Sequence, residues 1–126
     1  MKKALVDLGS NTIRLSVYKV YEDGSFSLLF SEKETAGLVN YISEKHMSVE
    51  GFDKACDVIF DFKRLTAQFD IRDLNIFATA SLRNIVNRDE AVAYIKEKTG
   101  EDVNVISGKE EARLGYYGAL TGADLD

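Results

Sequence analysis

The segment VDLGSNTIRL, residues 6–15, constrains the fold of this chain more than any other part of the sequence. An apolar run ends at Asp7 and a second apolar run follows a short polar turn, so two strands are joined by very few residues. Gly9 lets the backbone turn tightly and come close to a ligand. The turn is completed by Ser10, Asn11 and Thr12.

Short hydroxyl and amide groups beside backbone N–H groups are suited to cradling a phosphate. A carboxylate at the end of a buried strand, such as Asp7, is suited to a Mg²⁺ ion or its water shell. The alternative is an ordinary polar β-turn, in which Asp7 and Asn11 serve as turn formers. The segment taken alone supports both interpretations.

Hydrophobic periodicity along the rest of the chain predicts an α/β domain. Strands are expected over residues 3–8, 12–20, 25–34, 74–79 and 103–106. Helices are expected from the N-cap Ser48 to about residue 69, around 81–86, from 87 or 88 to a stop at Gly100, and from Ser107 onward. The Asp-Gly pair at 23–24 predicts a hairpin, and alternation in its return strand places Phe26, Leu28 and Phe30 on one face. Residues 36–47 are expected to form a loop or a short irregular helix.

Composition narrows the classes of function. The 126 residues suit one domain, and no apolar run approaches the roughly 20 residues that span a bilayer. The lone Cys56 excludes an internal disulfide and indicates a reducing, cytoplasmic environment. A net charge of −5 argues against non-specific nucleic-acid binding. His46, in a polar loop without Cys or His neighbours, is expected to be a surface residue.

Three motifs resemble those of one family. The segment DLGSNTIRL at residues 7–15 resembles the first phosphate loop of the exopolyphosphatase / guanosine pentaphosphate phosphatase (Ppx/GppA) family. The stretch ATASLRN at 78–84, followed by Asn87, and the stretch VISGKEEARL at 105–114 resemble two further motifs of that family, in the same order. The family belongs to the actin-like ATPase, sugar kinase and Hsp70 superfamily.

The resemblance implies a ribonuclease H-like domain with a mixed five-stranded sheet flanked by helices. The order of the expected elements, βββαβ(α)αβα, agrees with this fold. A second phosphate loop of the type Asp-x-Gly-Gly-Gly-Ser does not occur in the sequence. We therefore expect residues 1–126 to be the N-terminal domain of a larger protein, inactive in isolation and prone to form a homo-oligomer.

The resemblance also assigns roles to residues. It implies that Glu111 activates the attacking water, that Arg83 faces the phosphate, and that Asp7 helps to hold Mg²⁺. Ser107 and Gly108 mark a strand-to-helix turn, which is a ready anion site. The plainer interpretations are that Glu111 only complements a helix dipole and that Arg83 is a surface residue. For Asn87, the role of helix N-cap is favoured over ligand contact.

The function implied is a Mg²⁺-dependent hydrolase that releases orthophosphate from polyphosphate or converts guanosine pentaphosphate to the tetraphosphate. The sequence departs from the family pattern at Thr35, Ala80 and Tyr41, on the expected substrate side. These departures keep a second hypothesis open, a divergent regulatory member that binds a nucleotide or polyphosphate with weak catalysis. An actin-like or kinase relative is a third.

Overall fold

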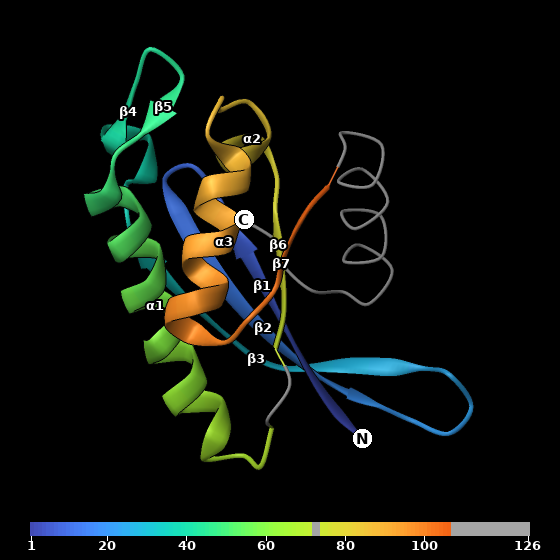
Figure 1. Cartoon of the computed structure of the whole chain (residues 1–126). Helices are drawn as coiled ribbons and strands as arrows, with labels where there is room; N and C mark the ends of the chain where they lie inside the picture. Colours follow the sequence, from blue (N-terminus) through green and yellow to red (C-terminus); the bar gives the residue numbers. More distant parts are fainter. Residues whose placement is uncertain (72–73, 107–126) are drawn as a thin grey trace.

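The computed structural model describes residues 1–71 and 74–106, and Figure 1 shows their arrangement. The main strands are β1 (Lys2–Leu8), β2 (Thr12–Val20), β3 (Phe26–Thr35), β6 (Leu74–Ala78) and β7 (Val103–Val105). The helices are η1 (Leu38–Tyr41), α1 (Val49–Ala67), α2 (Ala80–Arg83) and α3 (Arg88–Thr99), and a small hairpin consists of β4 (Ile42–Ser43) and β5 (His46–Met47). The helix expected from Ser107 onward lies outside the described residues.

The five main strands form one mixed sheet in the order β3-β2-β1-β6-β7. The first three strands pair antiparallel, while β6 is parallel to β1 and β7 is parallel to β6. This confirms the α/β fold expected from the sequence. Because β1, β6 and β7 run in the same direction, their carboxyl ends meet at one edge of the sheet, where ligands commonly bind in such folds.

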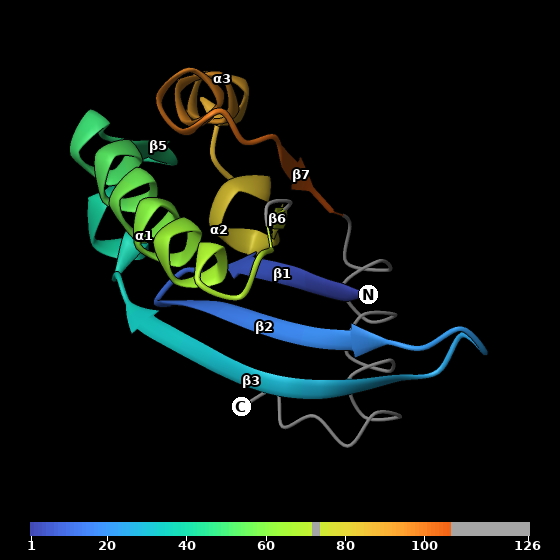
Figure 2. The same cartoon turned by 90° about the horizontal axis from the view of Figure 1, so that it is seen from below.

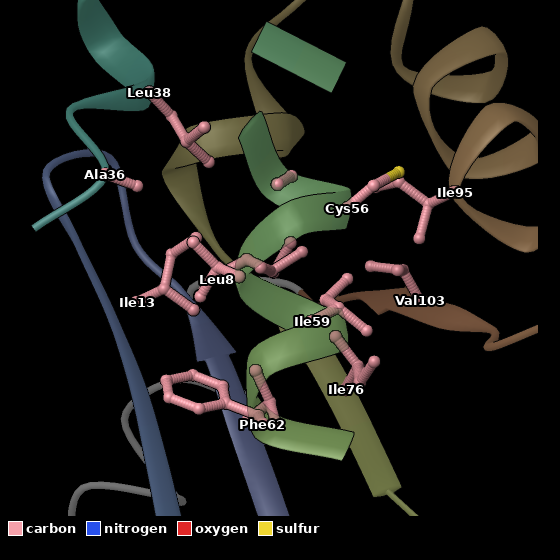
Figure 3. Packing of buried hydrophobic residues seen from close by; sticks show 14 of the residues in the cluster. Leu8, Ile13, Ala36, Leu38, Cys56, Ile59, Phe62, Ile76, Ile95 and Val103 are labelled. Atoms are coloured by element: carbon pink, nitrogen blue, oxygen red, sulfur yellow. The ribbon is translucent and has the colours of Figure 1, made fainter. Parts of the chain in front are cut away.

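The core lies between the sheet and the helices, which Figure 2 shows on one face of the sheet. Leu8, Ile13 and Ile76 point from three strands towards α1, whose Ile59 and Phe62 meet them (Figure 3). Each fully buried side chain of this size contributes about 1.5–3 kcal/mol to folding. Among the described residues, no helix has both the length and the apolar character that crossing a bilayer requires.

Helix α1 begins where the sequence predicts. The Ser48 side chain accepts a hydrogen bond from the Gly51 N–H at 3.3 Å, which satisfies one of the free donors of the first turn. At the end of α3, Gly100 adopts a left-handed conformation with φ of 79°, the usual way for a helix to stop at glycine. Local signals of this kind placed the start of α1 and the end of α3 correctly, whereas α1 ends at Ala67 and α2 covers Ala80–Arg83 in place of the expected 81–86.

The expectation that Phe26, Leu28 and Phe30 share one face of β3 is wrong. The pairing register shifts between Val17 and Tyr18, so Phe30 lies opposite Val17 while Leu28 lies opposite Tyr18. Successive residues of a strand point to opposite faces, so this bulge directs Phe30 towards the core and Leu28 towards the other face. Strict alternation cannot reveal a bulge that inserts one residue.

Residues 36–47 contain more structure than the sequence predicts. The short helix η1 is followed directly by the β4–β5 hairpin, in which Ile42 pairs with Met47 and Ser43 with His46. The two turn residues, Glu44 and Lys45, have φ values of 50° and 64°. Two-residue turns with positive φ normally use Asn-Gly or Gly-Gly, so Glu-Lys gave no turn signal.

Cys56 is buried in α1, at 2% exposure. Burial in the first place, and the Asp53 carboxylate in the second, raise the pKa of the thiol from its ordinary 9.0 to about 11. As the pH rises, the Cys56 thiol therefore loses its proton in the unfolded protein at a lower pH than in the folded protein. We expect the free energy of unfolding to fall as the pH rises from about 9 to about 11, because the unfolded state then binds fewer protons.

Urea unfolding at several pH values measures this effect, and Cys56→Ala is the control that removes the contribution of the thiol. Since the thiolate is the reactive form, the folded protein should also resist thiol reagents at about pH 8 and react once unfolded. An equal decline in stability in Cys56→Ala would show that other groups cause the pH dependence.

Candidate functional site

Two of the three motifs come together at the carboxyl edge of the sheet. Leu8, the last residue of β1, lies beside Ala78, the last residue of β6. The turn at residues 9–11 leaves β1 at the same level at which α2 leaves β6 (Figure 1). Segments about 70 residues apart in sequence thus become neighbours, as expected for parallel strands.

A side chain joins the two motifs directly. Ser81, in α2, donates a hydrogen bond from its Oγ to the carbonyl oxygen of Leu8. Ser81 is 1% exposed, so this bond is shielded from water. The bond satisfies a buried carbonyl at the point where β1 becomes the turn, and it holds α2 beside that turn.

The turn after β1 leaves little room for a side chain at Gly9. A Cβ atom there would overlap the carbonyl oxygen of Thr12, a backbone atom that cannot rotate away. The Gly9 N–H donates to the Asp7 carbonyl at 3.1 Å, which tightens the turn. The close approach of Gly9 to the backbone therefore supports the role that the sequence suggests for this glycine.

The carbonyl groups of the turn are bound to the segment after β3. Asn11 O accepts from Gly37 N and Ser10 O accepts from Val39 N, both at 2.8 Å. Within residues 1–71 and 74–106, the N–H groups of Ser10 and Asn11 have no hydrogen-bond acceptor. The turn is thus anchored through its acceptors and keeps two donors available, which is the arrangement that a bound phosphate requires.

Asp7 lies on the sheet face opposite to α1. It pairs in register with Arg14 on β2, and Arg14 pairs with Lys33 on β3. Cross-strand partners share a face, so the three form a row across the sheet, one acidic and two basic. The Asp7 side chain is half-buried, and its Oδ1 atom is shielded from solvent.

The described residues contain no group of three or more His, Cys, Asp or Glu side chains that would enclose a metal ion. The role of Asp7 as a metal contact stays a prediction.

Arg83 connects the second motif to the start of the third. The side chain is half-buried, and its Nη1 donates to the Ile106 carbonyl at 3.3 Å. The Ile106 N–H in turn donates to Ala78 O at 2.9 Å. The chain therefore leaves β7 at the same edge, next to α2. Three residues assigned from the sequence, Ser107, Gly108 and Glu111, lie outside the described residues.

For Asn87 the predicted position is confirmed, but the predicted capping hydrogen bond is not. Asn87 occupies the N-cap position of α3, but its side chain makes no capping hydrogen bond. Instead, Asn87 Nδ2 donates to Met47 O at 2.9 Å, and Met47 N donates to Asn87 Oδ1 at 3.1 Å. The side-chain amide therefore both donates to and accepts from the backbone of Met47 in β5, as the backbone of a neighbouring strand would. Nothing in the sequence signals this pairing, because the hairpin that receives it is itself not predictable.

The three departures from the family pattern lie around the same edge. Thr35 ends β3 and pairs with Thr12, and Ala80 opens α2 directly after Thr79. Tyr41 ends η1, and its carbonyl accepts from Ser48 N at 2.9 Å. His46 is exposed on β5, as expected.

Comparison with known proteins gives a consistent result. The sequence model of the Ppx/GppA phosphatase family matches residues 16–124. Exopolyphosphatase 1 of Mycobacterium leprae is 28% identical over 117 residues, which cover 92% of this chain and 34% of that protein. The chain thus spans about a third of the length of the curated relatives that it matches.

Solved structures show the same relationship. The crystal structure of an exopolyphosphatase from Cytophaga hutchinsonii superimposes with a TM-score of 0.83 and 26% identity, over 94% of this chain and 38% of the other. The Ppx/GppA family member from Aquifex aeolicus gives a TM-score of 0.81 at 24% identity, over 92% of this chain and 38% of the other, which shows a shared actin-like ATPase fold. With a family match over most of its length, this chain belongs to the Ppx/GppA phosphatase family.

Proposed function

We propose that this chain is the phosphate-loop domain of an exopolyphosphatase-type hydrolase, which releases terminal orthophosphate from polyphosphate. One observation carries the proposal. The turn at residues 9–11 and helix α2 meet at the carboxyl edge of the sheet, where the N–H groups of Ser10 and Asn11 have no acceptor among the described residues. The relatives that are named exopolyphosphatases support the same class of reaction.

In the proposed reaction, a water oxygen bonds to the terminal phosphorus while the bond from that phosphorus to the bridging oxygen breaks. Glu111 accepts a proton of the water, and the shortened chain leaves with the bridging oxygen and its electron pair. Ser10 and Asn11 hold phosphate oxygens through their N–H groups, and Arg83, Ser107 and Gly108 complete the anion site. Phosphoryl transfer depends mainly on such positioning and charge stabilisation.

We propose Mg²⁺ as the cofactor, with Asp7 as its contact in this chain. The ion would neutralise charge on the phosphate oxygens. The remaining ligands would be water, the substrate, and residues of the parent protein outside this chain. By parent protein we mean a polypeptide that contains this chain together with the further part that the relatives have.

Guanosine pentaphosphate is the second candidate substrate, because it carries the same terminal phosphoanhydride. The third candidate is a member that binds phosphates with weak catalysis. It is supported by Thr35, which pairs with Thr12 beside the phosphate turn, and by Ala80, which precedes the Ser81 that bonds to Leu8. The three candidates predict different results for orthophosphate release: release from polyphosphate, release from guanosine pentaphosphate, or little release from either.

The test is orthophosphate release by the parent protein with Mg²⁺, from long polyphosphate, guanosine pentaphosphate and ATP in parallel. We expect release from polyphosphate that EDTA abolishes and that excess Mg²⁺ restores. Residues 1–126 alone should release none, since half of the phosphate site would be missing. Release from the pentaphosphate alone would select the second candidate, and no release from any compound by the folded parent protein would contradict a hydrolase.

A further inference from the structure

The segments around the phosphate turn are joined into a closed ring of hydrogen bonds. The turn at residues 9–11 binds the segment 36–39, and that segment continues into η1 and the β4–β5 hairpin. The hairpin binds residues 86–87, and these follow α2, whose Ser81 binds back to β1 at Leu8. Figure 1 shows η1, the hairpin and α2 together at one end of the molecule.

Asn87 is the link that closes this ring. Its amide makes both of its bonds to the backbone of Met47, and the neighbouring Val86 N–H donates to Lys45 O at 2.7 Å. A side-chain amide can take the place of the backbone groups of a strand because it offers one hydrogen-bond donor and one acceptor side by side. Asn87 is half-buried, so both bonds are partly protected from water.

The hairpin needs this support. Glu44 and Lys45 both adopt positive φ angles without being glycine, and such a strained backbone conformation persists only where the surrounding structure imposes it. A two-stranded hairpin of two residues per strand has no independent stability. The bonds from residues 86 and 87 are therefore what we expect to hold the hairpin in place.

The same bonds fix both ends of the segment that carries Arg83. Helix α2 has four residues, too few to be stable alone. Ser81 anchors it on the side of the phosphate turn, and Asn87 anchors the chain four residues after Arg83. Arg83 thus lies between two fixed points, each tied to a different part of the ring.

We propose that Asn87 is a positioning residue, which closes the ring through Met47 and so fixes Arg83 relative to the phosphate turn. The inference rests on the proposed function, since it assigns Asn87 a part in phosphate binding through Arg83. Asn87 itself touches the hairpin backbone and not the substrate.

The test compares Asn87→Ala with Asn84→Ala in the parent protein. Both variants remove an asparagine amide from the segment after Arg83, but Asn84 is exposed. We expect Asn87→Ala to raise the KM for polyphosphate about five- to tenfold, with kcat nearly unchanged. The net loss of one or two hydrogen bonds changes an equilibrium by about this factor. Asn84→Ala should leave both parameters unchanged.

A double-mutant cycle with Arg83→Gln separates positioning from a merely structural role. If Asn87 acts through Arg83, then Asn87→Ala raises KM little further in the Arg83→Gln background. An undiminished increase in that background, or an equal increase in Asn84→Ala, would overturn the proposal.

Amide hydrogen exchange gives a readout independent of turnover. Asn87→Ala should speed exchange at Met47, whose N–H loses its acceptor, and leave Ile59 in the middle of α1 protected. Unchanged protection of Met47 overturns the link. If the parent protein releases no phosphate, the proposed function fails. The double-mutant cycle is then measured through the Kd for polyphosphate, and the proposal requires that Asn87→Ala weaken binding much less in the Arg83→Gln background than in the wild type.

Discussion

Replacing Glu111 by glutamine in the parent protein is expected to lower kcat for phosphate release by about a hundred- to ten-thousandfold. Glutamine has the size of glutamate but cannot accept a proton, and the loss of a general base typically has an effect of this size. The KM should change little, because the carboxylate is expected to act on the attacking water and not to bind the phosphate chain. Steady-state rates of orthophosphate release with Mg²⁺ measure both parameters.

The neighbouring residue provides a matched control. Glu110→Gln removes the same charge one position earlier in the sequence. If the two glutamates only complement a helix dipole, which is the plainer interpretation, the two variants should behave alike. A loss confined to Glu111→Gln supports the role as base, whereas similar small losses in both variants would contradict it.

The second large effect is expected from Gly9→Ala, which should lower phosphate release about a hundredfold and reduce the free energy of unfolding by about 1–3 kcal/mol. The added methyl group would overlap the Thr12 carbonyl oxygen, so the backbone of the turn must move. That movement would displace the Ser10 and Asn11 N–H groups, and small misplacements of binding groups reduce rates strongly. Rates of phosphate release and urea unfolding of the same protein measure the two effects.

Gly24→Ala is the control for a general loss of stability. Gly24 has a φ of 88°, and a Cβ added there would meet no other atom within 4 Å. It lies in the β2–β3 hairpin, at the end of β2 remote from the phosphate turn. Alanine there should cost about 1 kcal/mol through the left-handed conformation alone. Phosphate release should then remain normal at temperatures where the variant is folded. If both variants lost activity in proportion to their stability, no special role of Gly9 would be needed.

Local signals in the sequence predicted the main elements. Alternation over residues 12–20 and the helical spacing of Phe52, Ala55 and Ile59 indicate which side of each element is buried, and the burial of apolar side chains is the dominant force that drives folding. Ser48 and Gly100 predicted helix ends, because capping depends on a few neighbouring residues. The site motif at residues 7–12 was likewise recognisable, since its chemistry lies within one turn.

Contacts between distant segments were not predictable in this way. The bulge in β3 depends on how Phe30 and Leu28 meet β2, and alternation within one strand does not record it. The hairpin turn at Glu44–Lys45 lacks the usual turn residues, and its bond to Val86 comes from a segment about 40 residues away. Asn87 occupies the predicted N-cap position of α3, but its bonds to Met47 in place of a capping bond were not predictable for the same reason.

What the sequence determined by itself were the strands, the helices and the phosphate turn, because each depends on residues close together in the chain. Only the tertiary structure decided that Ser81 binds Leu8, that Asn87 binds Met47, and that Arg83 lies between these two anchors. Such pairings join groups about 40 to 70 residues apart. They form because parallel strands bring their carboxyl ends to one edge, where buried polar groups must find partners in neighbouring segments.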